Sequence, residues 1–120
     1  MRVLVDTSVW IDHFKKGEDR LLGLLEHCRV LMHPFVLGEL ACGNFRNRRE
    51  VFALLADLPV AVVASDEEVL AFIEEHSLMG RGIGYMDAHL LAATRLNPEV
   101  RLWTRDQSLD KQATKMDIAV

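Results

Sequence analysis

Four acidic residues stand at positions where solvation alone does not explain an acid. They are Asp6, Glu39, Asp87 and Asp106. If these carboxylates converge without a cation, they repel one another and raise their own pKa values. Oxygen-only ligands of this kind favour Mg²⁺ or Mn²⁺ over softer metals. The four acids therefore predict a hard-metal site.

The first of these acids directly follows residues 3–5, a run of three apolar residues. Such a run predicts a short strand that is buried on both faces. Either Thr7 or Ser8 can cap the helix that begins immediately afterwards. Ligands of open parallel sheets bind beyond the carboxyl ends of the strands. We therefore expect Asp6 at the mouth of a site, with the alternative that it only caps the helix or starts a turn.

The other three acids also stand at the ends or faces of predicted elements. Glu39 lies in a predicted helix, residues 35–42, that is otherwise nearly all apolar. Asp87 begins the predicted helix 86–96, and Asp106 follows a predicted strand by two residues. Together with Asp6, all of them are expected at one edge of one sheet, which is the ligand crevice in this class of fold.

Each of these three acids also has an ordinary explanation. Glu39 could pair with a base such as Arg46. Asp87 could be only a partner of the helix dipole, and Asp106 only a turn residue. For each acid taken alone, the ordinary explanation is as good as the explanation that it belongs to a metal site. Their shared placement at one sheet edge favours the site.

The elements that must position these acids alternate between helix and strand patterns. Strands are predicted over 3–5, 30–32, 60–63 and 101–104, with a short edge strand over 118–120, and helices over 18–28, 35–42, 46–57, 65–80, 86–96 and 109–116. This alternation predicts an α/β fold, a three-layer α/β/α sandwich around a short, mainly parallel sheet of the Rossmann-like kind.

Length, charge and cysteine usage bound the class of protein. The 120 residues predict one domain, residues 1–120. The net charge of -4 argues against sequence-independent coating of DNA, but not against a nuclease. The sequence has no apolar run of membrane-spanning length and no signal peptide, so we expect a cytoplasmic location without a membrane partner. Cys28 and Cys42 are expected to be small buried hydrophobes rather than a disulfide.

Four segments resemble the successive motifs of the PIN-domain ribonucleases, most closely the short single-domain toxins of the VapC type. These segments are residues 3–11, 39–43, 85–92 and 102–106, so the resemblance extends along the whole chain. It implies that Asp6, Glu39 and Asp87 bind Mg²⁺ or Mn²⁺, and that Asp106 is a fourth, more variable acidic position. It also implies an RNA substrate, a cognate antitoxin protein and, usually, a homodimer.

The resemblance further implies hydrolysis of RNA phosphodiesters by a metal-bound water, which needs no histidine as the general base. Thr7, Ser8 and Thr104 would support the acids or orient the substrate. Apart from the resemblance, we expect the glycine-rich loop 80–84 to be a hinge that positions Asp87, with Arg81 in contact with phosphate. His89 is two residues past Asp87, so we expect it on the other side of its helix, as a core or surface residue.

Several readings stay open at this point. The dense basic patch of Arg46, Arg48 and Arg49 is either a solvated helix face or a contact for RNA or antitoxin. The function could also be that of a PIN-type RNA-processing nuclease without an antitoxin, or of a non-catalytic PIN-fold protein-binding module. A phosphatase of the haloacid-dehalogenase type is disfavoured, because it needs a second Asp where Ser8 stands.

Overall fold

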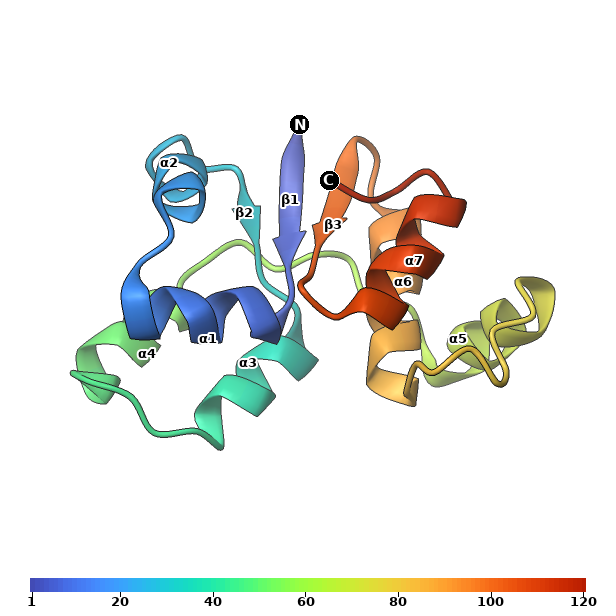
Figure 1. The fold of residues 1–120 in the computed structure, drawn as a ribbon, viewed down its shortest axis with the longest axis horizontal. Helices are drawn as coiled ribbons and strands as arrows, with labels where there is room; N and C mark the ends of the chain where they lie inside the picture. The colour runs from blue at the N-terminus through green and yellow to red at the C-terminus, as the bar shows by residue number, and fades with distance from the viewer.

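The computed structural model describes residues 1–120 and shows a small parallel sheet flanked by helices (Figure 1). The sheet contains β1 (Arg2–Val5), β2 (Val30–Leu31) and β3 (Val100–Trp103), in the order β2-β1-β3. Both outer strands run parallel to β1, and Val3 pairs with Val30 on one side and Arg101 on the other. Because β1 is central, its apolar side chains are buried on both faces, as the sequence predicted.

Seven helices cover the sheet. They are α1 (Thr7–Lys16), α2 (Asp19–Glu26), α3 (Pro34–Ala41), α4 (Arg48–Ala56), α5 (Asp66–Glu75), α6 (Tyr85–Leu96) and α7 (Gln107–Lys115). Helices α6 and α7 contact β3, α5 packs on α6, and α3 contacts both α1 and α4. The predicted α/β/α sandwich is confirmed. None of these helices has the length and apolar character that crossing a membrane requires.

All three strands point toward the same edge of the sheet, the lower edge in Figure 1. Each strand is followed along the chain by a helix that begins a few residues later: α1 follows β1, α3 follows β2, and α7 follows β3. A parallel sheet therefore gathers the residues that follow its strands into one place, although they are far apart in sequence.

The third predicted strand, residues 60–63, is wrong. Val60 forms only an isolated bridge with Met32. The next residues do not pair with a strand, because the side-chain amide of Asn97 makes the backbone hydrogen bonds that a neighbouring strand would make. Its Oδ1 accepts from the N–H of Val62 at 3.1 Å, and its Nδ2 donates to the carbonyl of Val62 at 3.0 Å. The predicted edge strand 118–120 is likewise a single bridge, between Leu102 and Ala119.

Two smaller predictions are also corrected. Asp6 itself occupies the N-cap position of α1, where Thr7 or Ser8 was expected. Cys28 and Cys42 are free, as expected, but both are exposed rather than buried. Cys28 follows the end of α2 with a positive φ of 55°, and Cys42 is the C-cap of α3, so neither lies inside a helix face that packs on the core.

Candidate active site

The sheet edge brings together the four acids that the sequence singled out. Asp6 follows β1, Glu39 lies in α3, Asp87 is in the first turn of α6, and Asp106 is the N-cap of α7. The pKa of Asp87 is raised, mainly because this carboxyl is half-buried and also because the charges of Asp6, Asp106 and Glu39 repel its ionised form. A hydrogen bond from the Gly84 N–H opposes this rise. The other three carboxylates are therefore close enough to Asp87 to affect its ionisation.

Asp6 is the most enclosed member of the cluster, with only 7% of its surface exposed. Its Oδ2 accepts hydrogen bonds from Thr104 Oγ1 at 2.7 Å and from Ser8 Oγ at 2.9 Å. The backbone N–H of Arg105 donates to Ser8 Oγ, and that of Asp106 donates to Thr104 Oγ1, both at 3.0 Å. Two hydroxyls therefore fix the rotamer of Asp6 and tie it to the loop after β3.

Glu39 and Asp106 are exposed but are also held by hydrogen bonds. Thr7 Oγ1 donates to Glu39 Oε1 at 3.0 Å, which connects α1 to α3. The pairing of Glu39 with Arg46 does not occur. Asp106 Oδ1 accepts from the Leu109 N–H at 2.9 Å, so one of its oxygens caps α7. Asp106 is thus a helix cap rather than a turn residue, and this role uses one of its oxygens and leaves the other available.

The same pattern holds for all four acids: one oxygen accepts a hydrogen bond, and the other has no partner within the protein. No Lys, Arg or His nitrogen lies within 4.0 Å of any of the four carboxylates. Clustered carboxylates without a cation are costly. Their free oxygens suit Mg²⁺ or Mn²⁺ in chemistry and number. As the side chains stand, no three acids, histidines or cysteines surround one point.

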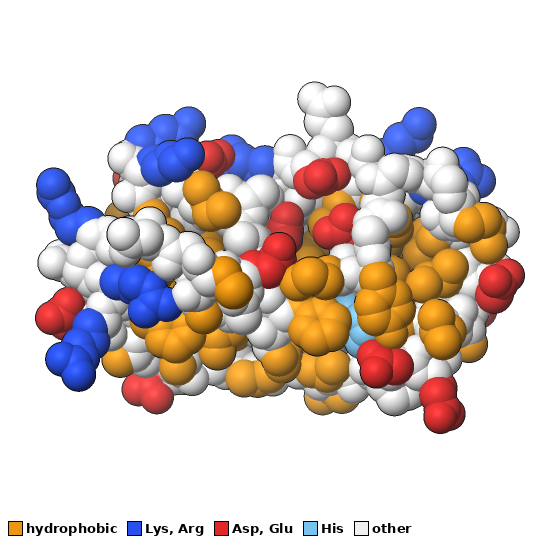
Figure 2. Space-filling view, turned by 90° about the horizontal axis from the view of Figure 1, so that it is seen from below, with side chains coloured by type: hydrophobic (Ala, Val, Ile, Leu, Met, Phe, Trp, Pro, Cys, Tyr) orange, Lys and Arg blue, Asp and Glu red, His pale blue; other side chains and the backbone are white.

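Figure 2 views the molecule toward this edge of the sheet. Acidic side chains gather near the middle of the face, with hydrophobic side chains exposed on both sides of them. Lys and Arg side chains are most frequent toward the end where α4 is, and others lie at the rim of the opposite end. The face thus has an acidic centre, apolar flanks and basic side chains at its periphery.

A polar network of the buried His89 with the exposed Asp66 and Tyr85 was missed by sequence reasoning. His89 is 2% exposed, and its Nε2 lies 3.1 Å from Asp66 Oδ1, which also accepts from the Tyr85 hydroxyl at 2.9 Å. His89 is therefore a core residue, which is one of the two positions, core or surface, that the sequence predicted for it. No local pattern marked Asp66, because it lies 23 positions from His89 and looks like an ordinary acid in the first turn of a helix.

His33 is the second buried histidine. It is the N-cap of α3, and its Nδ1 accepts from the Phe35 N–H at 3.0 Å. The pKa of His33 is lowered to about 4, mainly by burial and also by the neighbouring His89, whose ring centre is 6.2 Å away. His33 therefore stays neutral at pH 7 and acts as a hydrogen-bond acceptor at the start of the helix that carries Glu39.

The structure divides the basic residues that the sequence grouped together. Arg48 donates to the carbonyls of Ala41 and Gly43, so it stabilises the end of α3. Arg46 and Arg49 have no ion pair or hydrogen bond. Arg81 is exposed and donates to the carbonyl of Ser77 at 3.3 Å. No contact connects Arg81 to the four acids, and its role toward phosphate stays a prediction.

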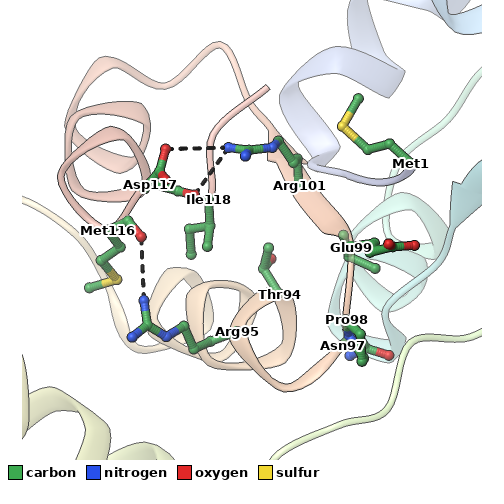
Figure 3. Close-up of a pocket in the computed structure, with 11 residues that line it drawn as sticks. Met1, Thr94, Arg95, Asn97, Pro98, Glu99, Arg101, Met116, Asp117 and Ile118 are labelled. Carbon is green, nitrogen blue, oxygen red and sulfur yellow. Dashed lines mark hydrogen bonds and ion pairs between the residues drawn. The ribbon is translucent and has the colours of Figure 1, made fainter.

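The largest cavity, of about 640 Å³, lies at the opposite edge of the sheet, next to Met1 and Glu99 (Figure 3). Its two arginines already donate to backbone carbonyls: Arg95 to Met116, and Arg101 to Asp117 at 3.0 Å. None of the four acids lines it. The acidic cluster, rather than the largest cavity, is therefore the candidate active site.

Comparison with known proteins agrees with this geometry. Residues 3–115 match the family model described as PIN domain. The chain is also 41% identical over 118 residues to Ribonuclease VapC32 from two strains of Mycobacterium tuberculosis, an alignment that covers 98% of this chain and 95% of each relative. Both findings extend over the segments that carry the acids. The chain belongs to the PIN-domain family.

Proposed function

We propose that this protein is a metal-dependent endoribonuclease that acts as the toxin of a toxin–antitoxin pair and hydrolyses RNA phosphodiesters. The observation that carries the proposal is the set of four carboxylates, each with a free oxygen and none with a cationic partner, at the ligand edge of a PIN fold. The ribonuclease named VapC32, which is 41% identical over nearly the full length, supports the same activity.

In this proposal Asp6, Glu39 and Asp87 bind Mg²⁺ or Mn²⁺, and Asp106 is a fourth ligand or a support for one. A bound ion of this kind activates the attacking water and neutralises the charge that develops on the phosphate. The protein's own task is to hold the carboxylates in place. The hydroxyls of Thr104 and Ser8 share one oxygen of Asp6, and the hydroxyl of Thr7 binds one oxygen of Glu39, so the second oxygen of each acid is left for a metal ion.

The raised pKa of Asp87 adds a pH dependence to the proposal. As the pH falls, this carboxyl is expected to take up its proton at a higher pH than an ordinary aspartate does. A protonated carboxyl is a poor ligand for a hard cation, since metal binding requires the deprotonated form. Metal affinity, and with it cleavage, should therefore fall on acidification through the titration of Asp87.

The proposal includes an antitoxin partner and a homodimer. It also places the protein in the cytoplasm, where the RNA substrate is. The name VapC of the relatives supports the partner. The apolar flanks of the acidic centre support a protein contact on this face, since Tyr85 is 43% and Met86 38% exposed beside Asp87. An antitoxin that covers the face and sets an Arg against the carboxylates would neutralise the cluster.

The activity is tested by incubating the purified protein with labelled RNA in Mg²⁺, in Mn²⁺ and in EDTA. Cleavage is expected only with the metal ions, and Asp6→Asn should lower it by orders of magnitude because a charged ligand is removed. Asp110→Asn is the matched control, an exposed acid on α7 outside the cluster. Full cleavage in EDTA, or by the Asp6→Asn protein, contradicts the metal-nuclease proposal. Absence of cleavage with either metal ion favours the non-catalytic binding module.

The toxin role is tested separately in cells. Expression of the wild type should halt growth, expression of Asp6→Asn should not, and co-expression of the antitoxin should restore growth. Unchanged growth together with strong cleavage in vitro would favour the RNA-processing nuclease instead.

A further inference from the structure

A second concave feature adjoins the acidic cluster and shares one residue with it. This pocket of about 290 Å³ lies between α1 and the loop that joins α3 to α4, and Glu39 is part of its lining. We name it the α1–α3 pocket. Because a proposed metal ligand lines it, any group bound there lies directly beside the proposed site of cleavage.

The walls of the α1–α3 pocket are mainly apolar and aromatic. Phe14 and Phe45 stack with their ring centres 4.5 Å apart and their planes at 18°. Ile11 and Leu40 complete the apolar lining, and Ile11 is 41% exposed. A polar ligand group alone would gain little from such walls, whereas a flat ring with apolar faces would be removed from water by them.

Two cations line the pocket beside these walls. Lys15 and Arg46 both line it, both are exposed, and neither forms an ion pair or a hydrogen bond. Arg48, two positions further on, differs from them because backbone carbonyls hold its guanidinium. Lys15 and Arg46 are therefore free to bind an anion at the pocket.

The position of Phe45 is fixed by its surroundings. Arg48 lies over the Phe45 ring, 5.9 Å from its centre, and also bonds the carbonyls of Ala41 and Gly43. The loop that forms one side of the pocket is thus attached to the end of α3. A wall formed in advance costs little ordering when a ligand binds.

We propose that the α1–α3 pocket binds one unstacked nucleotide of single-stranded RNA, with the base against Ile11, Phe14 and Phe45 and the neighbouring phosphates on Lys15 and Arg46. The volume suits one base, being at the lower end for small-ligand pockets. Apolar walls flanked by cations match a base flanked by phosphates. This inference rests on the proposed function and adds a substrate class to it: RNA whose base can leave the stack.

The test measures RNA affinity rather than cleavage, so that it stands apart from the test of activity. The Asp6→Asn protein is titrated in Mg²⁺ with a labelled single-stranded oligoribonucleotide at several salt concentrations. Adding Lys15→Gln and Arg46→Gln should weaken binding and reduce the slope of log Kd against log salt by about 1.4, which is about 0.7 for each phosphate contact to a single strand. Lys16→Gln and Arg49→Gln are the matched controls, two exposed cations outside the pocket lining.

The apolar wall is tested with Phe45→Ala and Phe45→Leu in the same Asp6→Asn protein. Loss of the ring should weaken single-strand binding roughly tenfold, as expected for one base–aromatic contact. Leu should restore part of the affinity, and binding of a duplex with the same sequence should not change. Circular-dichroism melts verify that each variant is folded.

Each outcome supports or overturns the inference. Unchanged affinity and salt slope in the pocket variants, or no measurable RNA binding at all, overturns it. So does a result in which the pocket variants lose only the antitoxin, since the pocket is then a protein-binding site. If the wild type cleaves no RNA while the pocket variants weaken RNA binding as expected, the nuclease proposal fails and the nucleotide pocket stands.

Discussion

Thr104 and Asp6 lie 98 positions apart in the sequence, and the Thr104 hydroxyl donates to Asp6 Oδ2 at 2.7 Å. The oxygen of that hydroxyl in turn accepts from the Asp106 N–H at 3.0 Å. One side chain therefore sets the orientation of the most buried acid and fixes the backbone of another. The hydroxyl at position 104 is a positioning group for Asp6 and Asp106.

Replacing this hydroxyl should lower activity without unfolding the protein. Thr104→Val keeps the shape of the side chain but removes the donor to Asp6, and cleavage should fall roughly 10- to 100-fold, as is typical of lost supports of metal ligands. Thr104→Ser should retain most of the activity because it keeps the hydroxyl. Steady-state cleavage at fixed Mg²⁺, with circular dichroism as a check of the fold, measures this. Full activity of Thr104→Val would show that the hydrogen bond does not matter.

Asp87→Asn should separate two effects of the acidic cluster: the repulsion that destabilises the metal-free protein, and the binding of the metal ion. The folded protein binds the Asp87 proton more tightly than the unfolded chain, because the pKa is raised. The contribution of this group to stability therefore falls as the pH rises from its ordinary pKa of 3.8 through the raised value. Asp87→Asn removes the charge, so it should slightly stabilise the metal-free protein at pH 7.

With metal ions present, the wild type should be more stable than Asp87→Asn. An ion at about 100 times its Kd should stabilise the wild type by roughly 2.7 kcal/mol, because it binds only the assembled cluster. Asp87→Asn should lose most of this gain. Thermal melts of both proteins in EDTA and in Mn²⁺ give the comparison. Equal metal-induced shifts in the melting temperature would place Asp87 outside the metal site.

His33 should contribute to unfolding in acid. Its pKa is about 4 in the folded protein against 6.5 for an ordinary histidine, so the unfolded chain binds more protons between these values. The free energy of unfolding should therefore decrease as the pH falls from 6.5 toward 4, by an amount on the order of 2 kcal/mol. His33→Asn keeps an acceptor at the N-cap and cannot titrate. Urea unfolding between pH 4 and pH 7 should give a shallower curve for this variant; parallel curves would contradict the prediction.

Arg105 should stabilise the loop after β3 through two carboxylates. Its Nε lies 3.0 Å from Asp12, and its guanidinium also contacts Glu18. Arg105→Ala should lower the free energy of unfolding by about 1 kcal/mol, the scale of a partly exposed ion-pair network, and the loss should shrink in 1 M salt. Arg105→Lys should recover only part of the lost stability, because a single ammonium replaces the planar guanidinium that contacts both carboxylates. A loss that does not depend on salt would assign the effect to packing on Trp103 instead.

The sequence allowed the position of the acids to be predicted because a parallel sheet turns order along the chain into position in space. Each apolar strand ends near an edge, so Asp6 and Asp106 could be placed from local patterns alone. Glu39 could be found because an acid in an apolar helix is conspicuous. The fold class followed from the same alternation of elements.

Long-range polar contacts could not be predicted in this way. Residues 60–63 have the composition of a strand, but Asn97, 35 positions from Val62, supplies the hydrogen bonds that a neighbouring strand would give. Similarly, nothing near Asp66 in the sequence points to His89. The three arginines after α3 looked equivalent, and only the structure separates the one that bonds backbone carbonyls from the others.

The placement of β1 at the centre of the sheet has a consequence for the timing of synthesis. The strand that is made first acquires its second neighbour, β3, only when residues 100–103 have been translated. When residue 99 has been added, the nascent chain contains Asp6, Glu39 and Asp87, but not the Thr104 hydroxyl that orients Asp6. At about 5–20 residues per second, translation from residue 31 to residue 104 takes roughly 4–15 s. A ribosome making this protein is thus expected to carry an incomplete nuclease for most of that time, and to be exposed to the finished enzyme only near the end of translation.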